Sequence, residues 1–166
     1  MVAMAAECPG KVIFFAQDAH DPLIVAQRAR AKRVVFVESG EIVAAEGPIE
    51  HRLPLSQVPL TRGGLLGFQV ENTLAAVGAC WALDMAWDSI CDGLYSFDSD
   101  SKNAPGRFNL MRYRDATVIA DYGHNPDAMR ALVAAFNALP AQTHTKRTVV
   151  ISGAGDRRDE DIRQQT

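Results

Sequence analysis

The stretch that most constrains the fold of this 166-residue chain is residues 117–136, TVIADYGHNPDAMRALVAAF. Its first four residues are mostly apolar or β-branched, which predicts a short buried strand ending before Asp121. Asn125 and Pro126 then suit the N-cap and the first position of a helix. The inward face of this helix is predicted to consist of the apolar residues that recur at helical spacing, namely Ala128, Leu132, Ala135, Phe136 and Leu139.

The loop between this strand and this helix is a candidate binding site. In α/β sheets, nucleotides and anions commonly bind where a strand end meets a helix N-terminus, because the N-terminus offers free backbone N–H groups and partial positive charge. Asp121 and His124 lie in this loop. Both residues can equally serve only to connect strand and helix, so their position leaves a structural role open.

The first part of the chain alternates strand and helix patterns. Residues 11–16 (KVIFFA) predict a strand, and residues 21–32, which begin with Asp-Pro, predict a helix. Residues 33–38 and 41–46 are β-rich runs joined by Ser39-Gly40, which predicts a hairpin. Strand and helix in alternation indicate an α/β fold class.

Residues 47–62 contain three prolines, so we expect turns and extended pieces there. The glycine-rich residues 63–67 lack the Lys-Ser/Thr ending of a phosphate-binding P-loop, which favours a flexible lead into the next helix. His20 and His51 are isolated from other chemically active residues, and we expect both on the surface or in loops.

Two helices are predicted next, over residues 69–83 and 87–97. Asn72 lies near the start of the first one, where its amide can both donate and accept hydrogen bonds, as recognition of an adenine edge requires. An ordinary capping or solvent-facing role is the alternative for Asn72. The buried faces are predicted to consist of Val70, Leu74, Val77 and Trp81 in the first helix and Ile90, Leu94 and Phe97 in the second.

A polar run at residues 98–103 (DSDSKN) predicts a linker between two domains. Beyond it, residues 107–113 and 117–120 predict two strands, and residues 148–152 predict a further buried strand after the helix. Strand, helix, strand is the order found in parallel α/β sheets with a right-handed crossover.

Composition narrows the class of partners. The net charge is −3 and no basic run occurs, so we expect no nucleic-acid partner. No apolar run reaches the roughly 18 residues of a spanning helix, so we expect no membrane partner either. Cys8, Cys80 and Cys91 show no metal-type spacing, which indicates a reducing compartment and a cytoplasmic location.

Three motifs carry a resemblance to a known family. Residues 121–129 (DYGHNPDAM) resemble the signature that opens the C-terminal domain of the Mur ligases, the ATP-dependent amide-forming enzymes that include the folylpolyglutamate synthetases. Residues 104–109 (APGRFN) resemble their Pro-Gly-Arg element, and residues 67–76 (GFQVENTLAA) resemble their Asn-x-x-Ala-Ala helix. The amino-acid sequences of these three motifs and of residues 155–162 (GDRRDEDI) are most similar to the cyanophycin synthetase branch of the family. The resemblance covers essentially the whole chain.

The resemblance implies an α/β fold in two parts. Residues 1–98 would be the C-terminal part of a Mur ligase central, ATP-binding domain. Residues 99–166 would be the N-terminal part of a Rossmann-like Mur ligase C-terminal domain. No P-loop motif occurs in the chain. We therefore expect a piece of a longer ligase that is inactive by itself.

The resemblance also implies roles for four residues. Asn72 would contact adenine, Arg107 would contact the ATP phosphates, and Asp121 would accept hydrogen bonds from the ribose hydroxyls, with His124 close to the nucleotide. Arg107 and His124 are thus candidate catalytic residues, and no metal ligand is expected within the chain. The alternative for Arg107 is a surface salt bridge. The roles of Asp156, Arg157 and Arg158 stay open between a site and a solvated helix start.

The implied reaction makes an amide by phosphorylating a carboxylate with ATP and letting an amine attack the acyl phosphate. The implied cofactors are ATP and Mg²⁺. The implied partners are ATP, an amino acid and a polymer or peptide acceptor, in a full-length homo-oligomer. Within the cyanophycin branch the amino acid would be arginine, added to a poly-aspartate backbone. The alternatives are a peptidoglycan-type Mur ligase, a folylpolyglutamate synthetase, or a non-catalytic nucleotide-binding fragment.

Overall fold

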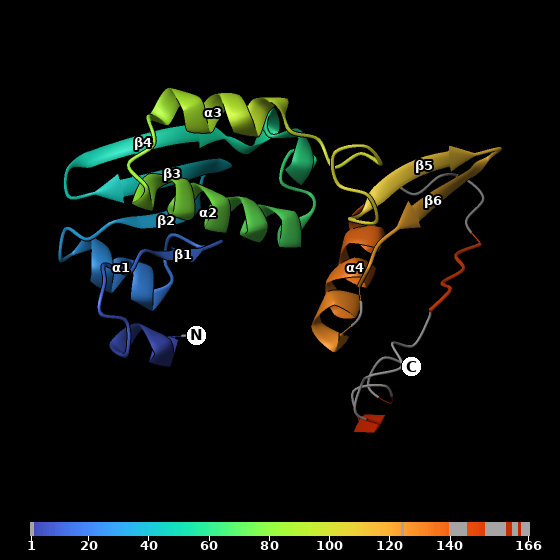
Figure 1. The fold of residues 1–166 in the computed structure, drawn as a ribbon, viewed down its shortest axis with the longest axis horizontal. Coiled ribbons are helices and arrows are strands. Elements are labelled where there is room, and N and C mark those ends of the chain that lie inside the picture. Colours follow the sequence, from blue (N-terminus) through green and yellow to red (C-terminus); the bar gives the residue numbers. More distant parts are fainter. Residues whose placement is uncertain (1, 124, 140–145, 152–158, 161–162, 164–166) are drawn as a thin grey trace. The chain divides into compact units, whose positions relative to one another are not determined.

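The chain divides into two units, Met1–Phe97 (unit 1) and Asp98–Thr166 (unit 2), each with its own fold (Figure 1). A computed structural model describes residues 2–123, 125–139, 146–151, 159–160 and 163. The α/β fold class expected from the sequence is confirmed, because both units combine strands with helices. The identity of each unit as a part of a particular Mur ligase domain remains a prediction.

Unit 1 is built on a four-stranded sheet in the order β1-β2-β3-β4. Strands β1 and β2 are parallel and are connected through α1, while β2, β3 and β4 form an antiparallel meander. Unit 1 begins with a 3-10 turn at Val2–Ala6, and two more at Leu55–Gln57 and Pro59–Thr61 precede α2. Its strands and helices are β1 (Phe14–Ala16), α1 (Pro22–Arg28), β2 (Val34–Glu38), β3 (Glu41–Glu46), β4 (Ile49–Pro54), α2 (Gly67–Ala82) and α3 (Trp87–Ser96).

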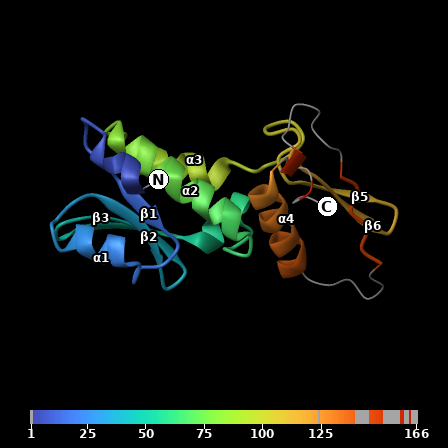
Figure 2. The same ribbon diagram turned by 90° about the horizontal axis from the view of Figure 1, so that it is seen from below.

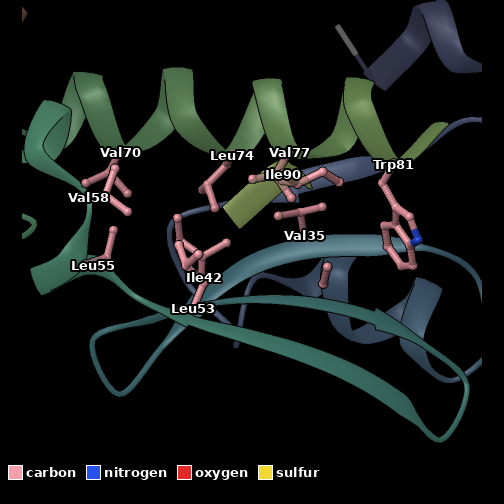
Figure 3. Packing of buried hydrophobic residues seen from close by; sticks show 11 residues of the cluster. Val35, Ile42, Leu53, Leu55, Val58, Val70, Leu74, Val77, Trp81 and Ile90 are labelled. Carbon is pink, nitrogen blue, oxygen red and sulfur yellow. The ribbon is translucent and has the colours of Figure 1, made fainter. Parts of the chain in front are cut away.

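Helices cover both faces of this sheet, which makes unit 1 a three-layer structure (Figure 2). Because successive side chains of a strand point to opposite faces, β2 contributes Val34 and Phe36 to the face that α1 covers. Val35 lies on the face that α2 and α3 cover. Figure 3 shows the larger core, in which α2 lies along the sheet. The predicted buried face of α2 is confirmed, since its buried residues include Val70, Leu74, Val77 and Trp81.

The predicted hairpin is confirmed, with β2 and β3 joined at Ser39-Gly40. Both turn residues have positive φ, 53° and 79°, the geometry that matches the right-handed twist of the flanking strands. Helix α1 begins as predicted, because the Asp21 carboxylate accepts a 2.8 Å hydrogen bond from the Leu23 backbone N–H. It ends at Arg28 and not at Lys32, since the chain turns through a left-handed Ala31 (φ 52°) to enter β2.

Three other expectations for unit 1 need correction. His51 lies on β4, half-buried, with its ring stacked 4.7 Å from that of Trp87, so it is neither a loop nor a simple surface residue. The glycine-rich segment before α2 is pinned and not a free lead, because Thr61 accepts hydrogen bonds from the backbone of Gly64 and Leu66. Phe97 is exposed because α3 ends at Ser96 and the chain becomes extended there.

Unit 2 consists of a two-stranded antiparallel hairpin followed by a helix. The predicted strands and helix are confirmed in position, but the predicted burial of residues 117–120 is wrong, since that strand is exposed or half-buried. Residues 148–151 form no strand and are exposed, because no described neighbouring strand accepts their backbone hydrogen bonds. Ser152 lies outside the described residues. The elements of unit 2 are β5 (Asn109–Tyr113), β6 (Ala116–Ala120) and α4 (Pro126–Ala138).

Candidate functional site

The loop that carries Arg107 is built around one buried amide, the side chain of Asn109. The Asn109 Oδ1 accepts a hydrogen bond from the Gly106 backbone N–H at 2.6 Å. Its Nδ2 donates to the Ala104 carbonyl at 2.9 Å and to the Ser99 carbonyl at 3.1 Å. Asn109 is only 3% exposed, so these bonds form away from competing water. The loop therefore closes on the first residue of β5.

The segment before this loop has its own turn, centred on Asp100. The Asp100 carboxylate accepts hydrogen bonds from the backbone N–H groups of Asn103 and Lys102, at 2.6 Å and 2.8 Å. These bonds, that from Asn103 first, lower the pKa of Asp100, because they stabilise the ionised carboxylate. The predicted linker is thus a hydrogen-bonded turn attached to the Arg107 loop.

The end of β6 holds the other side of the same loop. The Asp121 Oδ2 accepts a hydrogen bond from the Phe108 backbone N–H at 2.9 Å. One residue later, the Tyr122 backbone N–H donates to the Gly106 carbonyl at 2.8 Å. Phe108 is buried at a positive φ of 51°. The segment of Asp121 and the loop of Arg107, which are 14 positions apart in sequence, are therefore hydrogen-bonded to each other at one end of the hairpin.

The Arg107 guanidinium lies over the face of the Tyr122 ring, with Cζ 5.7 Å from the ring centroid. Arg107 is exposed and Tyr122 is 64% exposed. A guanidinium over an aromatic face is held by cation–π attraction while its N–H donors stay available at the edge of the plane. The salt-bridge alternative for Arg107 finds no support among the described residues, where no ion pair includes it.

The turn from β6 into α4 is close-packed. A Cβ on Gly123 would stand 2.9 Å from the Asp121 Oδ1, so a side chain at this position would displace the carboxylate. Helix α4 begins as predicted, because the Asn125 side chain accepts a 2.7 Å hydrogen bond from the Ala128 backbone N–H. The candidate His124 lies outside the described residues.

Asn72 lies in the second turn of α2, exposed to solvent. Its Nδ2 donates a 3.1 Å hydrogen bond to the Oε1 of Gln69, which is 6% exposed. This bond orients the amide of Asn72. The capping alternative does not apply, since Asn72 is inside the helix and Leu66 is the N-cap residue. Because Asn72 belongs to unit 1 and Arg107 to unit 2, each half of the expected nucleotide site is described by itself.

Within the described residues, no group of three or more His, Cys, Asp or Glu side chains is placed to hold a metal ion. None of the helices in this same part of the chain has the length and apolar character needed to span a bilayer. The open candidates Asp156, Arg157 and Arg158 lie outside the described residues. The geometry at Arg107 can therefore bind an anion through a fixed cation, and Asp121 can accept hydrogen bonds beside it.

Two residues of this site escaped the sequence analysis as functional candidates. Asn109 is the last residue of the Pro-Gly-Arg element (APGRFN, residues 104–109), and Tyr122 is the second residue of the DYGHNPDAM signature. Neither was assigned a function from the sequence. A signal was present for Asn109, because an Asn directly after a Gly-containing turn often bonds to nearby backbone groups. The stacking of Tyr122 with Arg107 depends on the hairpin register and could not be inferred from spacing.

The proteins to which this chain is similar are ligases by name. Residues 106–166 match the domain described as "Mur ligase, glutamate ligase domain". The cyanophycin synthetase of Crocosphaera subtropica is 32% identical over 163 residues, which is 98% of this chain and 18% of that protein. The UDP-N-acetylmuramoyl-L-alanyl-D-glutamate–2,6-diaminopimelate ligase of Fusobacterium nucleatum is 35% identical over 107 residues, 63% of this chain and 20% of that protein.

A solved structure of MurF from Acinetobacter baumannii is also similar, with a TM-score of 0.48 and 22% identity over 80% of this chain and 30% of that chain. This chain spans about a fifth of the length of the curated relatives that it matches. The match of residues 106–166 to the Mur ligase domain and the identity to the cyanophycin synthetases confirm the resemblance drawn from the three sequence motifs. The chain belongs to the Mur ligase family, and its residues 106–166 match that family's glutamate ligase domain.

Proposed function

We propose that this chain supplies part of the nucleotide site of an ATP-dependent ligase that joins a carboxyl group to an amino group. The observation that carries the proposal is the open end of the unit 2 hairpin, where Arg107 before β5 lies over Tyr122 after β6. The Asp121 carboxylate, also after β6, accepts a hydrogen bond from the Phe108 N–H. A cation and a hydrogen-bond acceptor on two adjoining, hydrogen-bonded segments suit a ligand that combines phosphates with hydroxyl groups.

Arg107 is the residue that we assign to the phosphates. A planar guanidinium donates in parallel to two oxygens of a phosphate, and such charge-assisted bonds are stronger than neutral ones. The Tyr122 ring limits the positions that the guanidinium samples, which lowers the entropy lost on binding. We infer that Arg107 stabilises negative charge as the phosphoryl group is transferred.

Asp121 is assigned to the ribose hydroxyls. One of its oxygens already accepts a hydrogen bond from the Phe108 N–H. A carboxylate has about four acceptor sites in total, so Asp121 can receive hydroxyl donors without releasing the loop. Asn72 on unit 1 would contact the adenine, and the bond from its Nδ2 to Gln69 keeps its Oδ1 directed as an acceptor. His124 is kept in the proposal as a neighbour of the nucleotide.

In the reaction that we propose, a carboxylate oxygen of the acceptor attacks the γ-phosphorus of ATP, and the bond to the bridging oxygen breaks to release ADP. The amine nitrogen of the incoming amino acid then attacks the acyl carbon. The acyl carbon–oxygen bond breaks, inorganic phosphate leaves, and the amine gives its proton to solvent. Mg²⁺ would supply further positive charge when bound.

For the substrate we propose arginine and an aspartate-rich polymer, because the similarity to cyanophycin synthetases extends over 98% of the chain. A diaminopimelate-adding ligase is the second candidate, favoured by 35% identity over 107 residues. Use of cytoplasmic ATP agrees with the free thiols of Cys8, Cys80 and Cys91. Assembly into a homo-oligomer belongs to the same proposal.

The proposal is tested by comparing the binding of ATP and of adenosine to the chain. Arg107→Ala should weaken ATP binding by about 10- to 100-fold, the loss expected for a hydrogen bond to a charged group. It should leave adenosine binding unchanged, because adenosine carries no phosphate. Arg112→Ala, which removes an exposed arginine of β5, is the matched control and should change neither affinity.

Equal losses of ATP affinity in Arg107→Ala and Arg112→Ala would mean that the loss of any positive charge weakens binding. That result would contradict the proposal of a specific contact at Arg107. Equal binding of ATP and adenosine by the unchanged chain would contradict it as well. The two substrate candidates are separated by assaying which amino acid, arginine or diaminopimelate, stimulates ADP release by the complete ligase.

A further inference from the structure

The Arg107 loop contains a buried polar residue that no assignment above uses, the side chain of Asn109. We propose that Asn109 is a positioning residue for Arg107: its amide fixes the loop backbone so that the guanidinium is held where the phosphates bind. The consequence for ATP binding rests on the proposed function, whereas the orientation of Arg107 can be tested without any ligand.

Asn109 uses both ends of its amide. The Oδ1 accepts from the Gly106 N–H, and the Nδ2 donates to carbonyls on two separate parts of the chain, Ala104 and Ser99. No other side chain of this length has one acceptor and a two-proton donor side by side. Aspartate would keep the acceptor but would turn an oxygen toward the carbonyls. The chemistry of the site therefore selects asparagine.

These bonds continue to Arg107 itself. The Arg107 carbonyl accepts from the Asn109 Nδ2 at 3.4 Å and also from the Ser99 hydroxyl. On the two flanking residues, the Gly106 carbonyl accepts from the Tyr122 N–H and the Phe108 N–H donates to Asp121. Both peptide groups that adjoin the Arg107 Cα are thus held. The backbone of Arg107 is fixed while its side chain stays exposed.

The fixed backbone explains how an exposed arginine can have a defined direction. A free arginine side chain loses much rotamer entropy when it binds an anion. Fixing the Cα–Cβ direction and placing the Tyr122 ring beneath the guanidinium removes part of this loss before the ligand arrives. Asn109 acts only through Arg107 in this scheme, and it touches no ligand.

The first experiment measures the order of the Arg107 side chain by the heteronuclear NOE of its Nε–H in isotopically labelled chain. Asn109→Asp should lower this NOE toward that of a free side chain. Asn103→Asp is the matched control: it makes the same substitution in the same segment, at an exposed residue whose amide has one carbonyl contact of 3.4 Å. The control should leave the NOE unchanged.

The second experiment measures ATP affinity in a double-mutant cycle. Asn109→Asp should weaken ATP binding roughly tenfold and leave adenosine binding unchanged, since the loss acts through one charge-assisted contact. In the Arg107→Ala background the same substitution should cause no further loss, because the residue through which it acts is gone. Additive losses in the cycle would overturn the positioning role.

Ser99→Ala serves as a second variant, which retains the Asn109 amide and removes only the hydroxyl bond to the Arg107 carbonyl. It should lower the Arg107 NOE by a smaller amount while the amide signals of β5 and β6 stay in place. An unchanged NOE in both Asn109→Asp and Ser99→Ala overturns the inference. A lowered NOE with no effect of Arg107→Ala on ATP binding would support the positioning and contradict the proposed function.

Discussion

Unit 1 and unit 2 are stabilised in different ways. Unit 1 has apolar cores on both faces of its sheet, made of residues that are almost fully buried. Figure 3 shows the core on the face that α2 and α3 cover. Among the described residues of unit 2, only Phe108, Asn109 and Ala135 are buried. Its loop is organised by hydrogen bonds from Asn109 and Asp121 instead. Burial of apolar area dominates folding free energy, so unit 1 is expected to carry most of the stability.

The difference between the two units separates packing from polar contacts as a means of fixing structure. A loop fixed by polar contacts can present an exposed cation without a large core behind it, and its geometry depends on a few hydrogen bonds. A packed sheet tolerates the loss of surface contacts but not the loss of core volume. Core substitutions in unit 1 should therefore cost more stability than substitutions in unit 2, and in unit 2 the geometry of the Arg107 loop should change as well.

The largest effect is expected from Leu74→Ala, which removes a side chain that is 0% exposed between α2 and the sheet. The cavity should lower the free energy of unfolding by about 2–5 kcal/mol. Both tryptophans of the chain, Trp81 and Trp87, lie in unit 1, so tryptophan fluorescence during urea unfolding reports this unit alone. Leu83→Ala, at a residue 76% exposed, is the control and should change the free energy little.

A smaller effect is expected from Asp121→Ala in unit 2. The Phe108 N–H would lose its carboxylate acceptor in a buried position, which costs roughly 1–3 kcal/mol. Asp121→Asn should keep most of this stability, since the amide oxygen can accept the same bond. Hydrogen exchange of the β5 and β6 amides measures the difference. Equal exchange in both variants would mean that the carboxylate does not hold the loop.

Loss of the N-cap of α4 should be smaller still. Asn125→Ala removes the acceptor for the Ala128 N–H and should destabilise the helix by about 1 kcal/mol. Asn137→Ala, near the other end of the same helix, is the control and should not destabilise it, because alanine favours helix interiors. Hydrogen exchange across α4 distinguishes the two, and similar protection in both variants would rule out the cap.

The smallest effect is expected at the surface of unit 1, where Arg52 pairs with Glu38, Glu41 and Glu50. Hydrogen bonding to Arg52 lowers the pKa of Glu38 in the folded state. The ion pair therefore contributes at pH values above the unfolded pKa, about 4.3, and its contribution is lost as pH falls through the lowered folded value.

Urea unfolding of Glu38→Gln should show a small loss at neutral pH that disappears in acid and in high salt. Glu71→Gln, at an exposed glutamate of α2, is the control and should show no pH-dependent difference. A loss that persists unchanged at pH 3 would exclude the ion pair as its cause.

Much of unit 1 could be predicted, because its patterns are local. The Ser39-Gly40 hairpin and the apolar face of α2 follow from turn geometry and periodicity. The partial burial of His51 could not be predicted, since it depends on α3 bringing Trp87 against β4. In unit 2, residues 148–151 have a strand-like composition but no strand, because strand formation needs a partner that composition does not specify.

The candidate site followed from motif resemblance more than from physical patterns. Arg107 and Asp121 are predicted to contact one ligand, which stays a prediction; the structure shows that their two segments are hydrogen-bonded to each other. The contribution of Asn109 depends on four bonds to backbone groups, which spacing alone does not reveal. Polar contacts of this kind are hard to predict from sequence patterns, because they depend on where the fold places the backbone groups.

The most direct test of the account is a map of backbone amide shifts when ATP and adenosine are titrated separately into the labelled chain. Shifts caused by ATP but not by adenosine should concentrate at residues 106–108 and 121–123. Shifts common to both ligands should appear near Asn72. Phosphate-dependent shifts that are spread over lysine and arginine residues elsewhere in the chain, or that are absent from the Arg107 loop, would contradict the assignment of this loop to the nucleotide.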